Sequence, residues 1–335
     1  MTTPLTDPDL IARRDRSMAR LRRQWLGTDA AEPFYLWGRR GVGQANPLSD
    51  PEAWMTEALA DLASHGYLLE DEDTFRPLVI EYGPYGVHFI DHILGAHVYE
   101  LREPENWQAR YLDSPVGSLR PPDLEASEAW SQARALAQAF LDSGATVPLF
   151  GMPTLSSALN IYLNLYGPGG LLVLVDDPEA ARHDLRVIQD VILAVHRWYL
   201  EHIPAQQLQP VVADHRTQPP GFGQLCGCST QLLSPATYAE LIAPLDDELL
   251  SLYPEGGMIH LCGGHTQHME TWRDMASLRA VQVNDRAAGD LDAYVGGLRE
   301  DQVLYVNPCQ EMPLREALEI TRGRPAVMVG ERPPA

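Results

Sequence analysis

The sequence contains no lysine, since all 25 basic residues are arginine. Without lysine the protein cannot form a lysine Schiff base, use a P-loop lysine or draw on a lysine general base, which excludes pyridoxal enzymes and lysine aldolases. Positive charge of any kind is scarce, because 46 Asp and Glu residues give a formal net charge of -21. This charge repels nucleic-acid phosphates and anionic lipids, so we expect no nucleic-acid partner and no membrane partner.

Cysteine is also rare, and the four residues lie in the C-terminal third, at Cys226, Cys228, Cys262 and Cys309. The N-terminal segment is charged throughout and lacks the apolar core of a secretory signal. The apolar runs are short and interrupted, so we expect no segment that spans a bilayer. These features predict a cytoplasmic protein whose cysteines are metal ligands, nucleophiles or buried thiols rather than a disulfide framework.

Short apolar runs alternate with amphipathic stretches along most of the chain. Eight runs read as strands, at 34–37, 78–81, 147–150, 211–213, 258–261, 280–283, 303–306 and 326–329. Helices are predicted between most of them, at 51–64, 125–143, 154–166, 178–202, 235–253, 266–276, 290–299 and 313–321. Strands without strict alternation, separated by helices, indicate a parallel sheet buried on both faces. The sequence therefore predicts an α/β protein, a (β/α)8 TIM barrel over 31–335 after an N-terminal helical extension over 1–30, with a doubly wound sheet as the alternative.

In such a barrel the chemistry lies where the strands end, on the loops that follow them. The polar side chains at those positions are the candidate site residues, namely Arg39, Arg40, the segment 81–91 with Glu81, Tyr85, His88 and Asp91, then Asp214, His215, Arg216, His260, Cys262, Asn284, Asp285, Asn307 and Cys309.

His260 and Cys262 lie two residues apart on a predicted strand, so both side chains project from one face and can bind the same ion. Cys309 follows 309 - 262 = 47 residues later, at the equivalent height of the barrel. Two thiolates and one imidazole match the ligand set of a catalytic zinc ion, with a fourth position left for water or substrate. Zinc that coordinates an incoming thiol makes it a thiolate near neutral pH, which favours alkyl transfer to sulfur.

Other interpretations of these residues remain open at this stage. A His-x-Cys pair also arises where a core histidine lies beside a packed thiol. Cys226-Gly-Cys228 is a second pair with the same spacing; we interpret it as packing or as a wall of the substrate site. We interpret His265 and His268 as groups behind the ligands or as solvent-facing side chains.

Several short segments resemble the uroporphyrinogen decarboxylase superfamily, and within it the zinc-dependent methyltransferases that work with corrinoid proteins. They are Leu233–Pro244, Gly257–Gly263, Phe150–Pro153 and Asp176–Pro178. The resemblance implies a (β/α)8 barrel and a zinc ion held by His260, Cys262 and Cys309. It also puts Asp285 near the position where related methionine-forming enzymes have a carboxylate ligand of the metal, so Asp285 is the candidate fourth ligand.

The decarboxylase branch of that superfamily is the alternative. Trp37-Gly-Arg-Arg40 and the segment 89–95 are similar to its tetrapyrrole-binding motifs, with Asp91 in the place of its aspartate. The full arginine-rich loop and a C-terminal histidine of that branch are missing, so the resemblance favours the methyltransferase branch. It implies methyl transfer between a corrinoid, methylcobalamin on a partner corrinoid protein, and a small thiol or another methyl donor or acceptor. The other outcomes are a metal-free carboxy-lyase acting on a uroporphyrinogen-like tetrapyrrole and a non-catalytic corrinoid- or tetrapyrrole-binding protein.

The segment Glu81–His92 is the expected specificity loop, because it gathers aromatic rings, imidazoles and a carboxylate after the second strand. We expect Arg39, Arg40, Glu81, Tyr85, His88 and Asp214 to bind substrate, and Asp91 and Asp285 to act in catalysis. The simpler interpretation of each aromatic residue is that it covers the mouth of the barrel.

Overall fold

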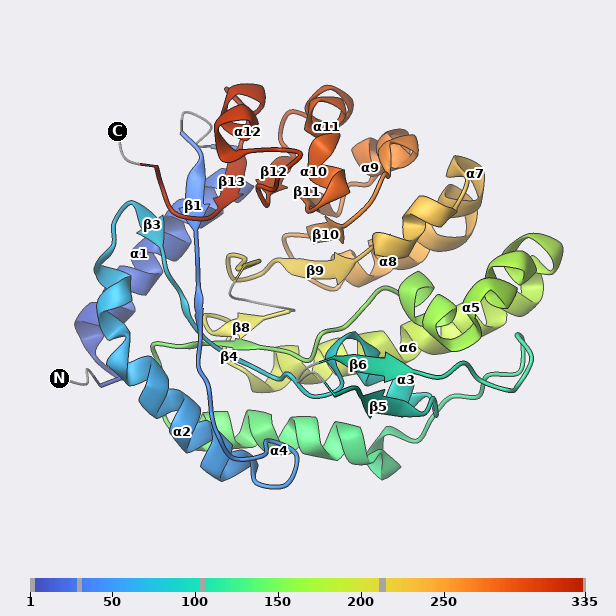
Figure 1. Cartoon of the computed structure of the whole chain (residues 1–335), viewed down its shortest axis with the longest axis horizontal. Helices are drawn as coiled ribbons and strands as arrows, with labels where there is room; N and C mark the ends of the chain where they lie inside the picture. The colour runs from blue at the N-terminus through green and yellow to red at the C-terminus, as the bar shows by residue number, and fades with distance from the viewer. Residues whose placement is uncertain (1–3, 29–31, 103–105, 211–214, 334–335) are drawn as a thin grey trace.

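The computed structural model describes residues 4–28, 32–102, 106–210 and 215–333. Two parallel sheets occupy the centre of the molecule, and helices surround them (Figure 1). One sheet has seven strands, in the order β3 (Thr74–Phe75), β1 (Phe34–Leu36), β13 (Ala326–Val329), β12 (Val303–Val306), β11 (Leu278–Val283), β10 (Gly257–Leu261) and β9 (Gly223–Cys226). The other has four, in the order β2 (Arg39–Arg40), β4 (Leu78–Glu81), β7 (Leu149–Gly151) and β8 (Leu208–Gln209).

The two sheets continue into one another where β1 and β2, and likewise β3 and β4, follow along the same stretches of chain. Trp37 N donates to Phe75 O at 3.0 Å and Arg39 N to Pro77 O at 2.8 Å, so the hydrogen bonding bridges the junction. At the other end, β8 and β9 share no ladder in the part of the chain that the structure describes. The architecture is thus mixed α/β with mostly parallel strands, which is compatible with a TIM-barrel-like fold, and the described residues alone do not form a closed barrel.

Three buried glutamines fill the seam between β8 and β9. Gln218 N donates to Gln209 Oε1 at 2.8 Å, and Gln209 Nε2 returns a bond to Gln218 O at 3.0 Å. Gln218 Nε2 in turn donates to Gln224 Oε1 on β9. Side-chain amides therefore replace the missing backbone ladder, because buried polar groups need partners. The strand expected at 211–213 lies outside the described residues.

The helices enclose the strands. They are α1 (Pro8–Trp25), α2 (Pro51–Ser64), α3 (Phe89–Ile93), α4 (Glu128–Asp142), α5 (Ala158–Asp176), α6 (Pro178–His202), α7 (Pro235–Thr237), α8 (Ala243–Ser251), α9 (Met269–Asp274), α10 (Arg286–Gly289), α11 (Leu291–Gly297) and α12 (Leu314–Ile320). Short 3-10 segments and a π-helix at Tyr238–Ile242 complete them, and an antiparallel hairpin of β5 (Val98–Glu100) and β6 (Trp107–Ala109) stands apart. Asp50 and Asp177 cap the starts of α2 and α6, where their side chains accept from Ala53 N and Ala180 N.

Helix α1 covers the edge of the two sheets where the strands begin. Its Trp25 packs edge-on against Phe222, just before β9, with ring centroids 4.8 Å apart. Arg14, buried in the same helix, donates from Nη1 to Val147 O, just before β7, at 3.1 Å. The amino ends of the strands are therefore closed, and the opposite ends are left for the site.

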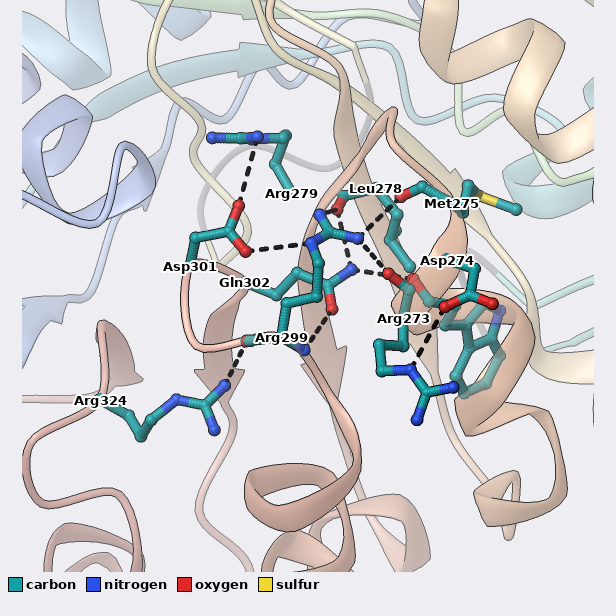
Figure 2. A network of polar contacts seen from close by, with 10 residues as sticks. Arg273, Asp274, Met275, Leu278, Arg279, Arg299, Asp301, Gln302 and Arg324 are labelled. Atoms are coloured by element: carbon teal, nitrogen blue, oxygen red, sulfur yellow. Dashed lines mark hydrogen bonds and ion pairs between the residues drawn. The ribbon is translucent and has the colours of Figure 1, made fainter.

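An arginine network reinforces the same amino-terminal end at β11 and β12 (Figure 2). Arg299 donates to the carbonyl oxygens of Leu278 and Met275 at 3.0 and 3.1 Å and to Asp301 Oδ1 at 3.0 Å. Gln302 Nε2 reaches the same Leu278 carbonyl at 2.9 Å. These bonds satisfy carbonyl groups that the strands leave unpaired where they begin.

Helix α5 departs from the expectation of short, interrupted apolar runs. At 19 residues it is long and apolar enough to cross a membrane by length and composition, although half of that window is buried inside the protein. Gly167, with φ 60° and ψ -150°, breaks its helical backbone before Pro168. Helix α5 packs chiefly against α6, as the core helix of a globular protein would.

Candidate metal centre

Thiols and an imidazole meet at the carboxyl ends of β9 and β10. Cys226, the last residue of β9, pairs in register with His260 of β10. Paired residues of parallel strands project from the same face, so both side chains point the same way. Cys228 opens the 3-10 segment after β9, and Cys262 directly follows β10. One donor atom from each of Cys226, Cys228 and His260 lies within 4.8 Å of the other two.

The distances within this group suit a thiophilic ion. The Sγ atoms of Cys226 and Cys228 are 3.5 Å apart, and Cys262 Sγ is 2.8 Å from His260 Nε2. Tetrahedral zinc, with bonds of about 2.3 Å to sulfur and about 2.0 Å to nitrogen, places neighbouring donors about 3.5–3.8 Å apart. The residues therefore fit a zinc ion after small adjustments of the His260 and Cys262 side chains.

The ring of His260 is fixed from behind. Its Nδ1 lies 2.7 Å from Oε1 of Gln282, its register partner on β11, and the side chain is only 2% exposed. Because a carbonyl oxygen only accepts, Nδ1 carries the proton and Nε2 faces the sulfur atoms with its lone pair. An imidazole held in this way by its other nitrogen is the usual arrangement of a metal-binding histidine.

The thiols of the group differ in acidity. A hydrogen bond from Cys228, with the nearby His260 and Arg216, lowers the pKa of Cys262 to about 4. The same donor lowers the pKa of Cys226 to about 6. The pKa of Cys228 is raised, because its proton is shared with these two sulfurs and its thiol is buried. Thiolates are the form that binds metals, so at least two sulfurs are ready as ligands at neutral pH.

Arg216 brings a positive charge to the group. Its Nη2 lies 3.2 Å from His260 Nε2. The neighbouring His215 stacks on Trp37, at the end of β1, with ring centroids 5.0 Å apart. His215 and Arg216 therefore lie at the carboxyl ends of the strands, and Arg216 presents a guanidinium to the sulfurs.

Polar side chains behind the thiols hold the two loops in place. Asn160 on α5 donates from Nδ2 to Cys226 Sγ at 3.6 Å and accepts from Ser229 N at 2.9 Å. His265 Nδ1 lies 2.9 Å from Thr230 Oγ1, while its Nε2 accepts from Gly263 N at 3.2 Å. His265 thus ties the Cys228 segment to the Cys262 loop.

His265 and His268 belong behind the ligands rather than in solvent. Both are fully buried, and His268 Nε2 lies 2.8 Å from Thr230 O. Of the two interpretations left open for these histidines, the structure selects the first.

Cys309 and Asp285 lie away from this group. Within the described residues, neither offers a donor atom within 4.8 Å of both His260 and a thiol of the group. Cys309 Sγ instead lies 3.5 Å from the main-chain oxygen of Asp285. The Asp285 carboxylate is exposed and accepts from Asn284 Nδ2 at 3.0 Å. The structure therefore brings together His260 and Cys262 of the predicted ligands, but not Cys309 or Asp285.

A second titratable pair lies after β4. Asp91 is fully buried on α3, and its Oδ2 is 2.5 Å from His88 Nδ1 and 2.9 Å from Asn164 Nδ2. Its Oδ1 has no partner among the described residues. Burial raises the pKa of Asp91 against the opposing effect of His88. Asn164 lies one helical turn beyond Asn160, so the same face of α5 contacts both this pair and Cys226.

The remaining predicted substrate residues lie near β2 and β4. Arg39 Nη2 pairs with Asp61 at 3.2 Å, Arg40 Nε pairs with Glu81 Oε2 at 2.9 Å, and Tyr85 donates to Gln132. A cleft of about 330 Å³ opens here, lined among others by Arg40, Glu81, Trp54 and Trp107. None of the sulfur or imidazole ligands lines this cleft. Asp214 lies outside the described residues.

No protein-family model and no curated protein matches the chain. Among solved structures, it is similar to a methyltransferase from Methanosarcina mazei, with a TM-score of 0.65 and 11% sequence identity. The match covers 94% of this chain and 92% of that one. At this identity the similarity establishes a shared fold over nearly the whole chain.

Proposed function

We propose that this protein is a methyltransferase that moves a methyl group from a corrinoid to a small thiol, with zinc bound at the group of Cys226, Cys228, His260 and Cys262. The observation that carries the proposal is the convergence of these thiols and the imidazole at the carboxyl ends of β9 and β10. A fold shared with a methyltransferase supports it. The carboxyl ends of parallel strands are also where barrel enzymes hold their chemistry.

Zinc bound there would supply Lewis acidity that keeps a substrate sulfur in its thiolate form near neutral pH. The chain's own residues must orient the substrate and take up the proton that the thiol releases. We assign this task to His88, because Asp91 engages its Nδ1 at 2.5 Å and leaves the other ring nitrogen to accept a proton. The thiolate then takes the methyl group, and the electron pair of the carbon–cobalt bond stays with cobalt.

The corrinoid is a substrate that we place on a partner protein. The cleft beside Arg40 and Glu81, at about 330 Å³, is sized for a small molecule rather than for a whole corrinoid. A corrinoid presented by a separate protein therefore suits this chain better than one held inside it.

The alternative of a metal-free tetrapyrrole decarboxylase receives less support. It would require Arg39 and Arg40 to bind the carboxylates of the tetrapyrrole. Each of these arginines is already paired with a carboxylate of the protein, Asp61 or Glu81. Substrate binding would have to break both pairs, and the thiol group would have no task.

The test uses the full chain stripped of metal with a chelator and then reloaded with zinc. Methylcobalamin and a panel of small thiols are added without oxygen, and cob(I)alamin is followed by its absorption. We expect product only with the zinc-loaded protein. Corrinoid retention without demethylation would indicate a binding protein, and CO2 release from uroporphyrinogen by metal-free protein would indicate the decarboxylase; either result contradicts the proposal.

Asp91→Asn separates proton transfer from metal binding in the same assay. Because Asp91 lies outside the sulfur group, we expect zinc content to stay unchanged while the rate falls about 100-fold, a typical contribution of acid–base catalysis. His202→Gln is the matched control, since His202 is exposed and its Nδ1 bonds only to Trp198 O in the same helix. An unchanged rate in Asp91→Asn would remove His88 and Asp91 from the mechanism.

A further inference from the structure

The group at β9 and β10 contains more donors than a catalytic zinc site with three protein ligands needs. Cys226 and Cys228 place two sulfurs 3.5 Å apart, and His260 faces them within 4.8 Å. Cys262 adds a third sulfur, 2.8 Å from His260 Nε2. Three sulfurs and one nitrogen thus converge from two neighbouring strands.

We propose that the metal is held by four protein donors, Cys226, Cys228, Cys262 and His260, and that Cys309 is not a ligand. This deepens the function proposed above, since it assigns the ligands of the same site. Its test measures metal binding and not methyl transfer, so the two can fail separately. Cys3His is one of the donor sets that zinc takes in closed tetrahedral sites.

The backbone fixes these donors more firmly than the set that includes Cys309. Cys226 and His260 are register partners on paired strands, and Gly227 N donates to His260 O at 2.9 Å just beyond them. The turn at Gly227 then returns Cys228 toward the same point. Cys309 lies after β12, two strands away from β10 in the sheet order. Its thiol would have to leave the Asp285 carbonyl and cross the end of β11 to reach the group.

The charge around the group also favours three thiolates. Three thiolates and one divalent zinc ion carry a net charge of -1, which a partly buried site must compensate. Arg216 supplies the opposite charge, because its guanidinium lies 3.2 Å from His260 Nε2 in this structure. Around a bound ion this cation would move aside by a short distance and pair with the sulfurs instead. A substrate thiol would enter such a centre by displacing one of the thiolates.

The first measurement needs no substitution. X-ray absorption at the zinc edge of the zinc-loaded full chain counts the sulfur and lighter neighbours of the ion. We expect three sulfurs and one nitrogen. Two sulfurs with two lighter neighbours would show that one of the three thiols is not a ligand, and would overturn the proposal. Failure of the folded chain to take up added zinc would overturn it as well.

Serine substitutions then assign the sulfurs. Cys226→Ser should remove one sulfur from the zinc spectrum and weaken zinc binding at least about 100-fold. Loss of a group that only orients a ligand already weakens metal binding about 10–100-fold. Cys309→Ser is the matched control and should change neither. The reverse pattern, with sulfur lost in Cys309→Ser and kept in Cys226→Ser, contradicts the proposal. Circular dichroism of each variant checks folding, and the wild-type sulfur count stays decisive if a variant does not fold.

Discussion

Cys226 and His260 are register partners on the neighbouring parallel strands β9 and β10. Both side chains consequently leave the sheet on the same face. Cys228, two positions beyond Cys226, has its sulfur within 4.8 Å of both donors, and Cys262, two positions beyond His260, has its sulfur 2.8 Å from His260 Nε2. Two strand ends with the same spacing thus produce one compact group of soft donors. The predictions below follow from this group and from the framework that holds it.

The thiols should differ sharply in reactivity when metal is removed. Because the pKa of Cys262 is lowered to about 4 and that of Cys226 to about 6, both are thiolates at pH 7. Iodoacetamide should label these two residues rapidly in chelated protein, and added zinc should suppress the labelling. Cys309 serves as the internal control, with equal labelling in both states. Peptide mass spectrometry reads out each site, and zinc protection of Cys309 alone would contradict this expectation.

Gln282 should matter to metal affinity although it does not touch the metal. Gln282→Leu keeps the size of the side chain but removes the acceptor that holds His260 Nδ1 at 2.7 Å. We expect zinc affinity to fall about 10–100-fold, as for other groups that orient a ligand. A competition titration against a zinc-binding dye measures it. Gln138→Leu, at an exposed glutamine of α4, should have no effect; an equally small effect at Gln282 would refute the orienting role.

The arginine network at the amino ends of β11 and β12 should stabilise the fold. Arg299→Met removes hydrogen bonds from a charged donor to the Leu278 and Met275 carbonyls, which keep Gln302 Nε2 and Leu278 N as their other donors. We therefore expect a loss of about 1.5–3 kcal/mol in the free energy of unfolding, as for hydrogen bonds to charged groups. Urea denaturation measures it. Arg315→Met is the control, because Arg315 is 92% exposed and only faces Glu319, and it should change stability by less than about 0.5 kcal/mol. Equal effects of the two substitutions would show that the network contributes nothing.

A buried histidine should make the fold sensitive to acid. Burial lowers the pKa of His196 to about 3, whereas an unfolded chain protonates this residue near pH 6.5. Between these values the unfolded state binds the extra proton, so stability falls as pH drops below 6.5. The loss attributable to His196 should reach about 2–3 kcal/mol at pH 4.5 relative to pH 7. Denaturation of wild type and His196→Gln at both pH values isolates this part, and identical pH dependence of the two proteins would refute it.

Much of the fold could be predicted from the sequence because its patterns are strong. The strands at 303–306 and 326–329 and the helices at 51–64 and 178–202 have the predicted bounds. Strand β9 was missed, because Gly223-Gln-Leu-Cys226 is too polar to read as an apolar run. Its place in the sheet comes from pairing with β10, which no local pattern reveals.

The missing strand also explains what was missed in the site. Candidate ligands were sought where predicted strands end, and that rule found His260 and Cys262. Cys226 satisfies the same rule once β9 is known, although Cys226-Gly-Cys228 had been interpreted as packing or as a substrate wall. Arg216 follows the strand expected at 211–213 and so satisfies the same rule, whereas Gln282 carries no sequence signal of its own, because only the folded chain brings it to His260.

Elemental analysis of the purified full chain tests the central claim most directly. A metal centre built from these side chains predicts about one equivalent of zinc per chain. It also predicts that the zinc is lost in a Cys226→Ser, Cys228→Ser double variant and retained in Cys309→Ser. A folded wild-type protein that holds no zinc even after zinc is supplied, or one that loses its zinc in Cys309→Ser alone, would contradict the account.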